Sequence, residues 1–168
     1  MATTRADAIG ILEDGHRSVQ SLFTGIGADE FARRGTIGGG DWSAKDLAGH
    51  LADWEEYALR TRDEWRRRER PWVEDIDTDE VNDRSIARHL ADASDAVRAR
   101  FADMHSRLLS ELGAMTEDEW QAPPFFGSER PRPLGDLLGA VLGGPDGPFR
   151  HADAHLPDLR AYVATVRT

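Results

Sequence analysis

The stretch that decides the fold is DWSAKDLAGHLADW, residues 41–54. Ser43 is a favourable residue for capping the amino end of a helix, and Asp46 follows three positions later, where its carboxylate can reach back as an acidic capping box. Trp42 and Leu47 occupy the two positions that form a hydrophobic staple across such a cap. These local signals predict a helix that starts directly after Ser43.

The apolar residues behind this cap keep to one helical face. They recur at steps of three and four residues, the spacing of a buried stripe, at Leu47, Leu51, Trp54 and Ala58. The helix is expected to run to about Glu69, because Pro71 cannot continue it.

Helical periodicity continues on both sides of this segment. The spacing predicts a first helix over 9–23, a long third helix from Thr78 to Gly113, a short turn over 116–120, a short helix over 134–141, and a last helix after Asp146. In the last helix Pro148 suits the first turn, and Pro157 is expected to cause a kink.

Four long helices with one apolar face each favour an all-α fold, a four-helix bundle. Short extra helices accompany it, and two stretches are expected to be loops: the glycine-rich residues 35–40 and the Pro-rich residues 121–133 before the last helix. Because the chain has 168 residues and no internal repeat, residues 1–168 are expected to form a single domain.

Composition excludes several classes of function. The absence of cysteine excludes disulfides, thiolate zinc sites, iron–sulfur clusters and a cysteine nucleophile. The formal net charge of −10 repels polyphosphate, so we expect no nucleic-acid partner. No long apolar run and no signal segment is apparent, which predicts a cytoplasmic protein without a membrane partner.

The arginine-rich run over residues 60–70 resembles a nucleic-acid patch at first sight. Acidic residues interleave with the arginines at helical spacing, and this pattern is more typical of a solvent-exposed face crossed by ion pairs. We therefore assign the run no binding role.

The histidines are the main candidates for chemistry. His151 and His155 are spaced one helical turn apart, so that both imidazoles could hold one metal ion, although such pairs often arise by chance. His50 lies on the buried stripe of the helix after Ser43, where an imidazole needs a hydrogen bond or a metal ion. Three imidazoles leave coordination positions open, as catalytic sites do.

The other histidines carry weaker signals. His16 lies on the inward face of the first helix, as a hydrogen-bonded core residue or as a pocket residue. His89 and His105 fall beside the apolar stripe of the long third helix, where solvated side chains are usual, and we assign them no role.

Two motifs resemble the DinB/YfiT-like superfamily. Residues 40–51, GDWSAKDLAGHL, are similar to its second-helix signature, which delivers the first metal-binding histidine. Residues 151–160, HADAHLPDLR, are similar to the second signature, which supplies the other two ligands. Within it, His155, Asp158 and Arg160 follow the arrangement typical of the mycothiol-dependent maleylpyruvate isomerase branch. That branch often has Glu at the position of His151, so the chain departs toward a three-histidine site.

The resemblance implies a four-helix bundle with one zinc or nickel ion on His50, His151 and His155. Asp158 and Arg160 would then orient the ligands or an anionic substrate, or form a simple surface ion pair. Trp54, one turn beyond His50, would wall the metal pocket or serve only as a core residue, and His16 would line the pocket. Mycothiol is the implied co-substrate.

Three hypotheses about function follow. In the first, a metal-dependent thiol S-transferase or isomerase adds a low-molecular-weight thiol to a small electrophile. In the second, a self-protection protein uses the same cavity to sequester or open a reactive small molecule, as in a neighbouring branch of drug self-resistance proteins. In the third, the site is vestigial and the bundle is a stress-linked protein that forms a homodimer.

Acidification should remove the metal ion. Imidazoles coordinate only when unprotonated, and their ordinary pKa is about 6.5. The charge of the ion holds them neutral below that pH, so we expect release as the pH falls through roughly 6 to 4. Metal content measured after dialysis at each pH checks this, and full occupancy well below that range would indicate carboxylate ligands.

Overall fold

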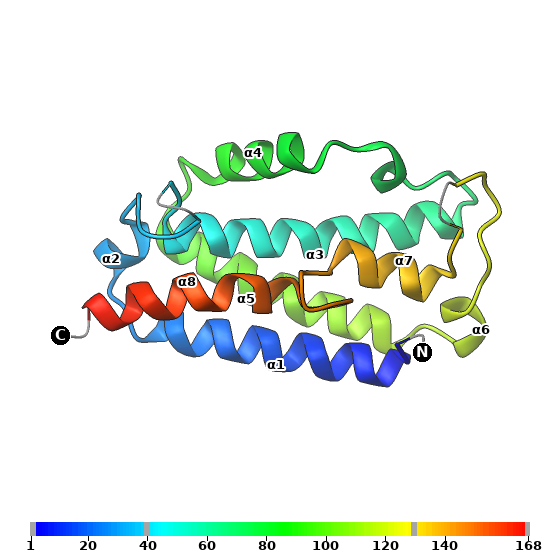
Figure 1. The fold of residues 1–168 in the computed structure, drawn as a ribbon, viewed down its shortest axis with the longest axis horizontal. Coiled ribbons are helices and arrows are strands. Elements are labelled where there is room, and N and C mark those ends of the chain that lie inside the picture. Colours follow the sequence, from blue (N-terminus) through cyan, green and yellow to red (C-terminus); the bar gives the residue numbers. More distant parts are fainter. Residues whose placement is uncertain (1–2, 39–40, 129–130, 167–168) are drawn as a thin grey trace.

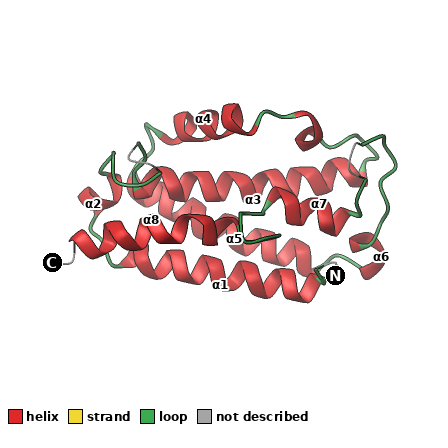
Figure 2. Ribbon diagram, viewed as in Figure 1, coloured by secondary structure: helices red, strands yellow, loops and turns green. Residues whose placement is uncertain are grey.

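The computed structural model describes residues 3–38, 41–128 and 131–166. In this part of the chain the elements are α1 (Arg5–Thr24), α2 (Ala28–Ala32), α3 (Ala44–Arg66), the 3-10 helix η1 (Trp72–Asp75), α4 (Thr78–His89), α5 (Ser94–Gly113), α6 (Glu117–Trp120), α7 (Leu134–Val141) and α8 (His151–Val166). The described residues form no strand, only two isolated bridges. The predicted all-α class is confirmed (Figure 2).

The long helices α1, α3, α5 and α8 form the bundle (Figure 1). Helix α3 packs on α5, and α1 packs on α8. The short α7 precedes α8 along the same edge of the bundle and packs on α3, while α4 lies over the outer side of α3. None of the described helices is long and apolar enough to cross a membrane.

The predicted start of α3 is confirmed in detail. The Ser43 hydroxyl accepts a hydrogen bond from the Asp46 backbone N–H at 3.0 Å, and the Asp46 carboxylate accepts from the Ser43 N–H at 2.9 Å. The helix ends at Arg66, slightly before the predicted Glu69. Most of its residues are buried, including many that are polar or charged. A helix enclosed in this way positions side chains toward several neighbours at once.

The predicted long third helix is wrong: the segment forms two helices, α4 and α5, separated at residues 90–93. The Lys45 ammonium donates hydrogen bonds to the backbone carbonyls of Leu90 at 3.1 Å and Asp92 at 2.8 Å. These bonds give hydrogen-bond partners to two carbonyls of the connection between the helices. The apolar stripe looks continuous in the sequence because both helices turn an apolar face toward α3.

Two other boundaries differ from the sequence-based expectation. Asp77, and not Thr78, caps α4 by accepting from the backbone N–H groups of Asp79 and Glu80. Helix α8 begins at His151, after a tight turn in which Gly147 has φ 122°, so Pro148 precedes the helix. Residues 39–40 of the glycine-rich stretch and 129–130 of the Pro-rich loop lie outside the described residues.

A pair of glycine substitutions tests the packing of α4 on α3. A Cβ added at Gly49 would lie 2.6 Å from the His89 ring, and that ring is held by Asp53 and Asp92. We expect Gly49→Ala to lower the free energy of unfolding by about 1–3 kcal/mol through overpacking. Urea unfolding measures this change.

Gly10→Ala is the matched control, because Gly10 is also helical and a Cβ there meets nothing within 4 Å. This substitution should raise the free energy of unfolding by about 0.5–1 kcal/mol, the usual helix-propensity gain of Ala over Gly. If Gly49→Ala stabilised the protein equally, α4 would not pack on α3 as described.

Candidate metal centre

Three histidines from two helices converge inside the bundle. His50 comes from α3, and His151 and His155 come from consecutive turns of α8. The Nε2 atoms of His50 and His151 are 3.0 Å apart, and those of His151 and His155 are 3.3 Å apart. One ligand atom from each residue lies within 4.8 Å of the other two. The structure thus brings together the three residues that the sequence predicted as ligands.

The local chain explains how these side chains meet. His151 is the first residue of α8, and its backbone N–H donates to the carbonyl of Leu142 at 2.9 Å. This bond ties the start of α8 to the end of α7. His155 follows one turn later on the same face, and the capped start of α3 sets the position of His50.

The geometry fits a single metal ion. Two nitrogens that share one zinc ion at about 2.0–2.1 Å lie about 2.9 Å apart in octahedral and about 3.3 Å apart in tetrahedral coordination, close to both Nε2 separations. The rings of His50 and His151 are inclined at 74°, and those of His151 and His155 at 59°. The ring edges therefore converge instead of stacking.

Electrostatics keeps these imidazoles in the form that binds metals. Burial, together with the charges of His151 and His155, holds the pKa of His50 well below its ordinary value. Burial and His155 lower the pKa of His151 to about 3. Burial also lowers the pKa of His155, while Asp158 opposes that shift. All three are neutral near pH 7, as metal ligation requires.

Two tryptophans enclose the cluster. The ring of Trp42 lies 4.8 Å from that of His50, and the ring of Trp54 lies edge-on 5.8 Å from that of His151, measured between centroids. The Trp54 indole N–H donates to the Asn82 side-chain oxygen at 3.0 Å. Trp54 therefore stands where the sequence predicted a pocket wall. The sequence offered no sign that Asn82 would fix it, because Asn82 belongs to another helix.

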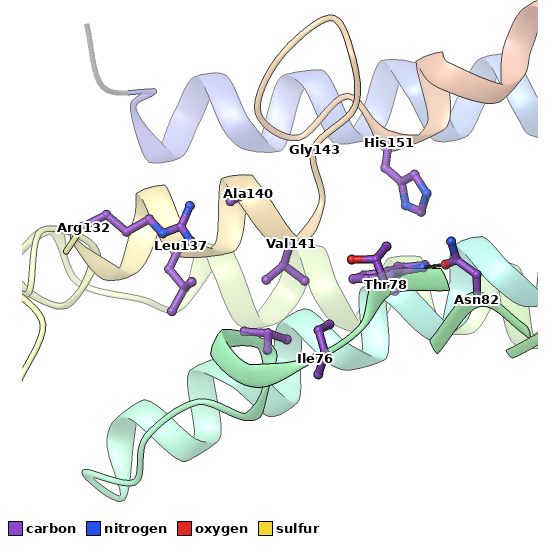
Figure 3. Close-up of a pocket in the computed structure, with 11 residues that line it drawn as sticks. Ile76, Thr78, Asn82, Arg132, Leu137, Ala140, Val141, Gly143 and His151 are labelled. Carbon is purple, nitrogen blue, oxygen red and sulfur yellow. Dashed lines mark hydrogen bonds between the residues drawn. The ribbon is translucent and has the colours of Figure 1, made fainter. Parts of the chain in front are cut away.

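A pocket of about 280 Å³ opens beside His151 (Figure 3). Figure 3 shows His151 at one end of the pocket and Arg132 at the other, with Leu137, Ala140 and Val141 between them. Thr78 and Asn82 add polar groups near His151, and Trp54, Val73, Ile76 and Gly143 complete the lining. The cluster thus stands at the end of a cavity large enough for a small molecule.

The other predicted site residues are less central. Asp158 and Arg160 are both exposed on α8, and Asp158 acts on His155 through its charge. His16 does not belong to the three-histidine cluster. Its ring stacks instead on the rings of Phe101 and His105. The roles predicted for these residues stay predictions.

The expectation that His89 and His105 are solvated is wrong, because both are buried. His89 lies 3.1 Å from the Asp53 carboxylate, and His105 lies 2.8 Å from that of Glu55. In each pair the acid comes from α3, a partner that spacing within one helix cannot reveal.

The arginine-rich run forms ion pairs, as predicted, but one of its arginines is buried and not solvent-exposed. Arg60 pairs with Glu64 at 2.7 Å. Arg62, however, is only 3% exposed and is held by Asp63 and Glu111. This part of α3 is therefore not an entirely solvent-exposed face.

Several solved structures share this fold. An uncharacterised protein from Escherichia coli UTI89 matches with TM-score 0.77 and 12% identity over 98% of this chain and 95% of that one. The colibactin self-resistance protein ClbS, in complex with dsDNA, matches with TM-score 0.75 and 12% identity, covering 99% and 97%. The mycothiol-dependent maleylpyruvate isomerase matches with TM-score 0.65 and 15% identity, covering 96% and 60%. No curated protein matches this sequence.

The structure of ClbS corrects one expectation. We predicted no nucleic-acid partner from the net charge of −10, but a protein of this fold is crystallised with dsDNA. A net charge averages the whole surface and does not describe the potential of any single face, so the exclusion was wrong.

The family is settled by sequence as well as by fold. A model of the DinB superfamily matches residues 11–143, most of the chain. That range includes α3 with the first signature motif, and it agrees with the resemblance found in the sequence. This chain belongs to the DinB superfamily.

Proposed function

We propose that this chain is a divalent-metal-dependent enzyme that transfers a low-molecular-weight thiol to a small electrophile or isomerises it through that thiol. The observation that carries the proposal is the convergence of His50, His151 and His155 at the end of a pocket of about 280 Å³. A structural metal site needs no adjoining cavity, whereas a catalytic one does.

His50, His151 and His155 would hold a zinc or nickel ion, for which three neutral imidazoles are suitable donors. When bound, such an ion lowers the pKa of a coordinated thiol or water and polarises a carbonyl group. Because His151 also lines the pocket, a molecule bound in the pocket lies beside the ligand cluster.

The walls of the pocket suit the binding of a small molecule. Trp54, fixed by its hydrogen bond to Asn82, and the aliphatic side chains of Leu137 and Val141 form an apolar part of the lining. The Thr78 hydroxyl offers a hydrogen bond near His151, and the Arg132 guanidinium, which pairs with Glu74 at 3.7 Å, lies at the other end. The pocket can therefore orient a molecule that has distinct polar and apolar parts.

Mycothiol is the thiol that we propose as co-substrate. The similarity of residues 151–160 to the isomerase branch supports this choice, as does the shared fold with the mycothiol-dependent maleylpyruvate isomerase. Since the chain spans only 60% of that isomerase, a thiol-transfer reaction on another electrophile is as compatible with the proposal as isomerisation.

A second candidate is a self-protection protein that sequesters or opens a reactive small molecule without thiol chemistry. The observation that favours it is the match to ClbS over nearly the full length of both chains.

A thiol-consumption assay separates the two candidates. Metal-loaded protein is mixed with mycothiol and a panel of electrophiles, such as maleate, N-ethylmaleimide and chlorodinitrobenzene. We expect catalytic loss of free thiol with at least one of them, and its abolition in His155→Ala. Loss of electrophile in a one-to-one ratio with protein, without loss of thiol, would instead indicate sequestration.

Metal content after His155→Ala tests the ligand assignment directly. The two remaining imidazoles no longer form a three-point chelate, so the variant should lose most of the bound metal ion. Elemental analysis of protein purified without a metal-affinity tag measures this loss. The bundle should stay folded, because its stability comes mainly from the apolar faces of the long helices. If His155 were instead a packed core residue, His155→Ala would lower the free energy of unfolding by about 1–3 kcal/mol with or without metal.

His89→Ala is the control. His89 is buried and bonded to Asp53, so the substitution should lower the melting temperature while metal content is unchanged. Retention of metal in His155→Ala, or equal loss in His89→Ala, would contradict the assignment.

A further inference from the structure

A second group of potential ligands lies inside the bundle. His16 from α1, Glu55 from α3 and His105 from α5 each place one ligand atom within 4.8 Å of the other two. None of them belongs to the three-histidine cluster. Three different helices of the bundle thus meet at this point.

Two polar atoms of this group are buried without a hydrogen-bond partner among the described residues. Glu55 is 8% exposed, and its Oε1 lies 2.8 Å from the His105 Nδ1, but its Oε2 bonds to none of the residues that the structure describes. The Nδ1 of His16 is also buried and unpartnered. A buried carboxylate oxygen in this state costs free energy, so its persistence calls for a ligand.

A small cavity lies beside these atoms. It has a volume of about 20 Å³, and both His16 and Glu55 line it. This is enough space for one water molecule. The cavity gives the unpartnered atoms room for a ligand that a fully packed core would not have.

We propose that His16, Glu55 and His105 bind a second divalent transition-metal ion of the zinc class. Two imidazoles and one carboxylate are an established donor set for such ions, and bundles build metal sites from inward side chains on facing helices. The 2.8 Å between His105 Nδ1 and Glu55 Oε1 is close to the separation of about 3 Å between two atoms that share an ion. A water molecule in the cavity supplies a fourth ligand.

Binding requires His16 to turn. Its ring lies parallel to that of His105, with centroids 3.8 Å apart and an interplanar angle of 7°, so the lone pairs of the two rings do not converge. The ion would then cross-link α1, α3 and α5, and it would stabilise the folded chain by mass action.

Zinc stoichiometry tests the proposal without any assay of activity. Protein freed of metal with EDTA is dialysed against Zn²⁺, and bound zinc is measured by elemental analysis. We expect two ions per chain in the wild type and one in each of His16→Ala, Glu55→Gln and His155→Ala. The double variant His16→Ala/His155→Ala should bind none, and His89→Ala should retain two.

The two sites are distinguishable when only one exists. A single wild-type ion that is lost in His16→Ala and retained in His155→Ala supports the second site and contradicts the three-histidine site. A single ion that is lost in His155→Ala and retained in His16→Ala overturns the second site. Two ions that are retained in both His16→Ala and Glu55→Gln overturn it as well.

A Co²⁺ titration of the unmodified chain gives the same answer should a variant fail to fold. The proposal predicts two equivalents with separate visible absorption bands, and a rise in melting temperature with each. Saturation of the unmodified chain at one equivalent, with that equivalent lost in His155→Ala, overturns it.

Discussion

The burial of α3 on nearly all sides is the constraint on which the rest of the structure depends. This helix carries polar and charged residues into the core, and each must find a partner there, because an unpaired buried charge is costly. Asp53 illustrates the solution: the Ser85 hydroxyl donates to it at 2.8 Å, and His89 and Arg100 lie within 3.1 Å and 2.8 Å. These partners come from α4 and α5, so the buried polar groups of α3 constrain how these two helices pack on it.

The parts of the fold that local chemistry determines were predictable from the sequence. The cap at Ser43 and Asp46 involves residues three positions apart, and the apolar stripe behind it repeats within one helix. The division between α4 and α5 gave no local signal, and the side chain that bonds to this connection, Lys45, reaches carbonyls 45 and 47 positions away in the chain. Residues 90–93 themselves contain no proline or glycine to end a helix.

The same distinction applies to the histidines. His151 and His155 were recognisable from their spacing, and His50 from its place on an apolar stripe, since an imidazole there needs a partner. His89 and His105 were missed because their acidic partners on α3 are 36 and 50 positions away. Glu55 in turn resembled one more charge of a solvent-exposed face. Acidic residues of α3 that look like surface residues in the sequence are in fact the ones that bind these buried imidazoles.

The buried polar groups of α3 fall into two classes. Asp46 and Asp53 are satisfied by the protein, whereas His50 and Glu55 each keep an atom that has no hydrogen-bond partner in the described part of the chain. His50 and Glu55 are five positions apart, a rotation of about 140° around a helix with 3.6 residues per turn. They therefore face different neighbours: His50 meets α8, and Glu55 meets α5 and α1. Because one enclosed helix contributes a donor to a cluster on each of two sides, both clusters depend on the same cap and the same packing.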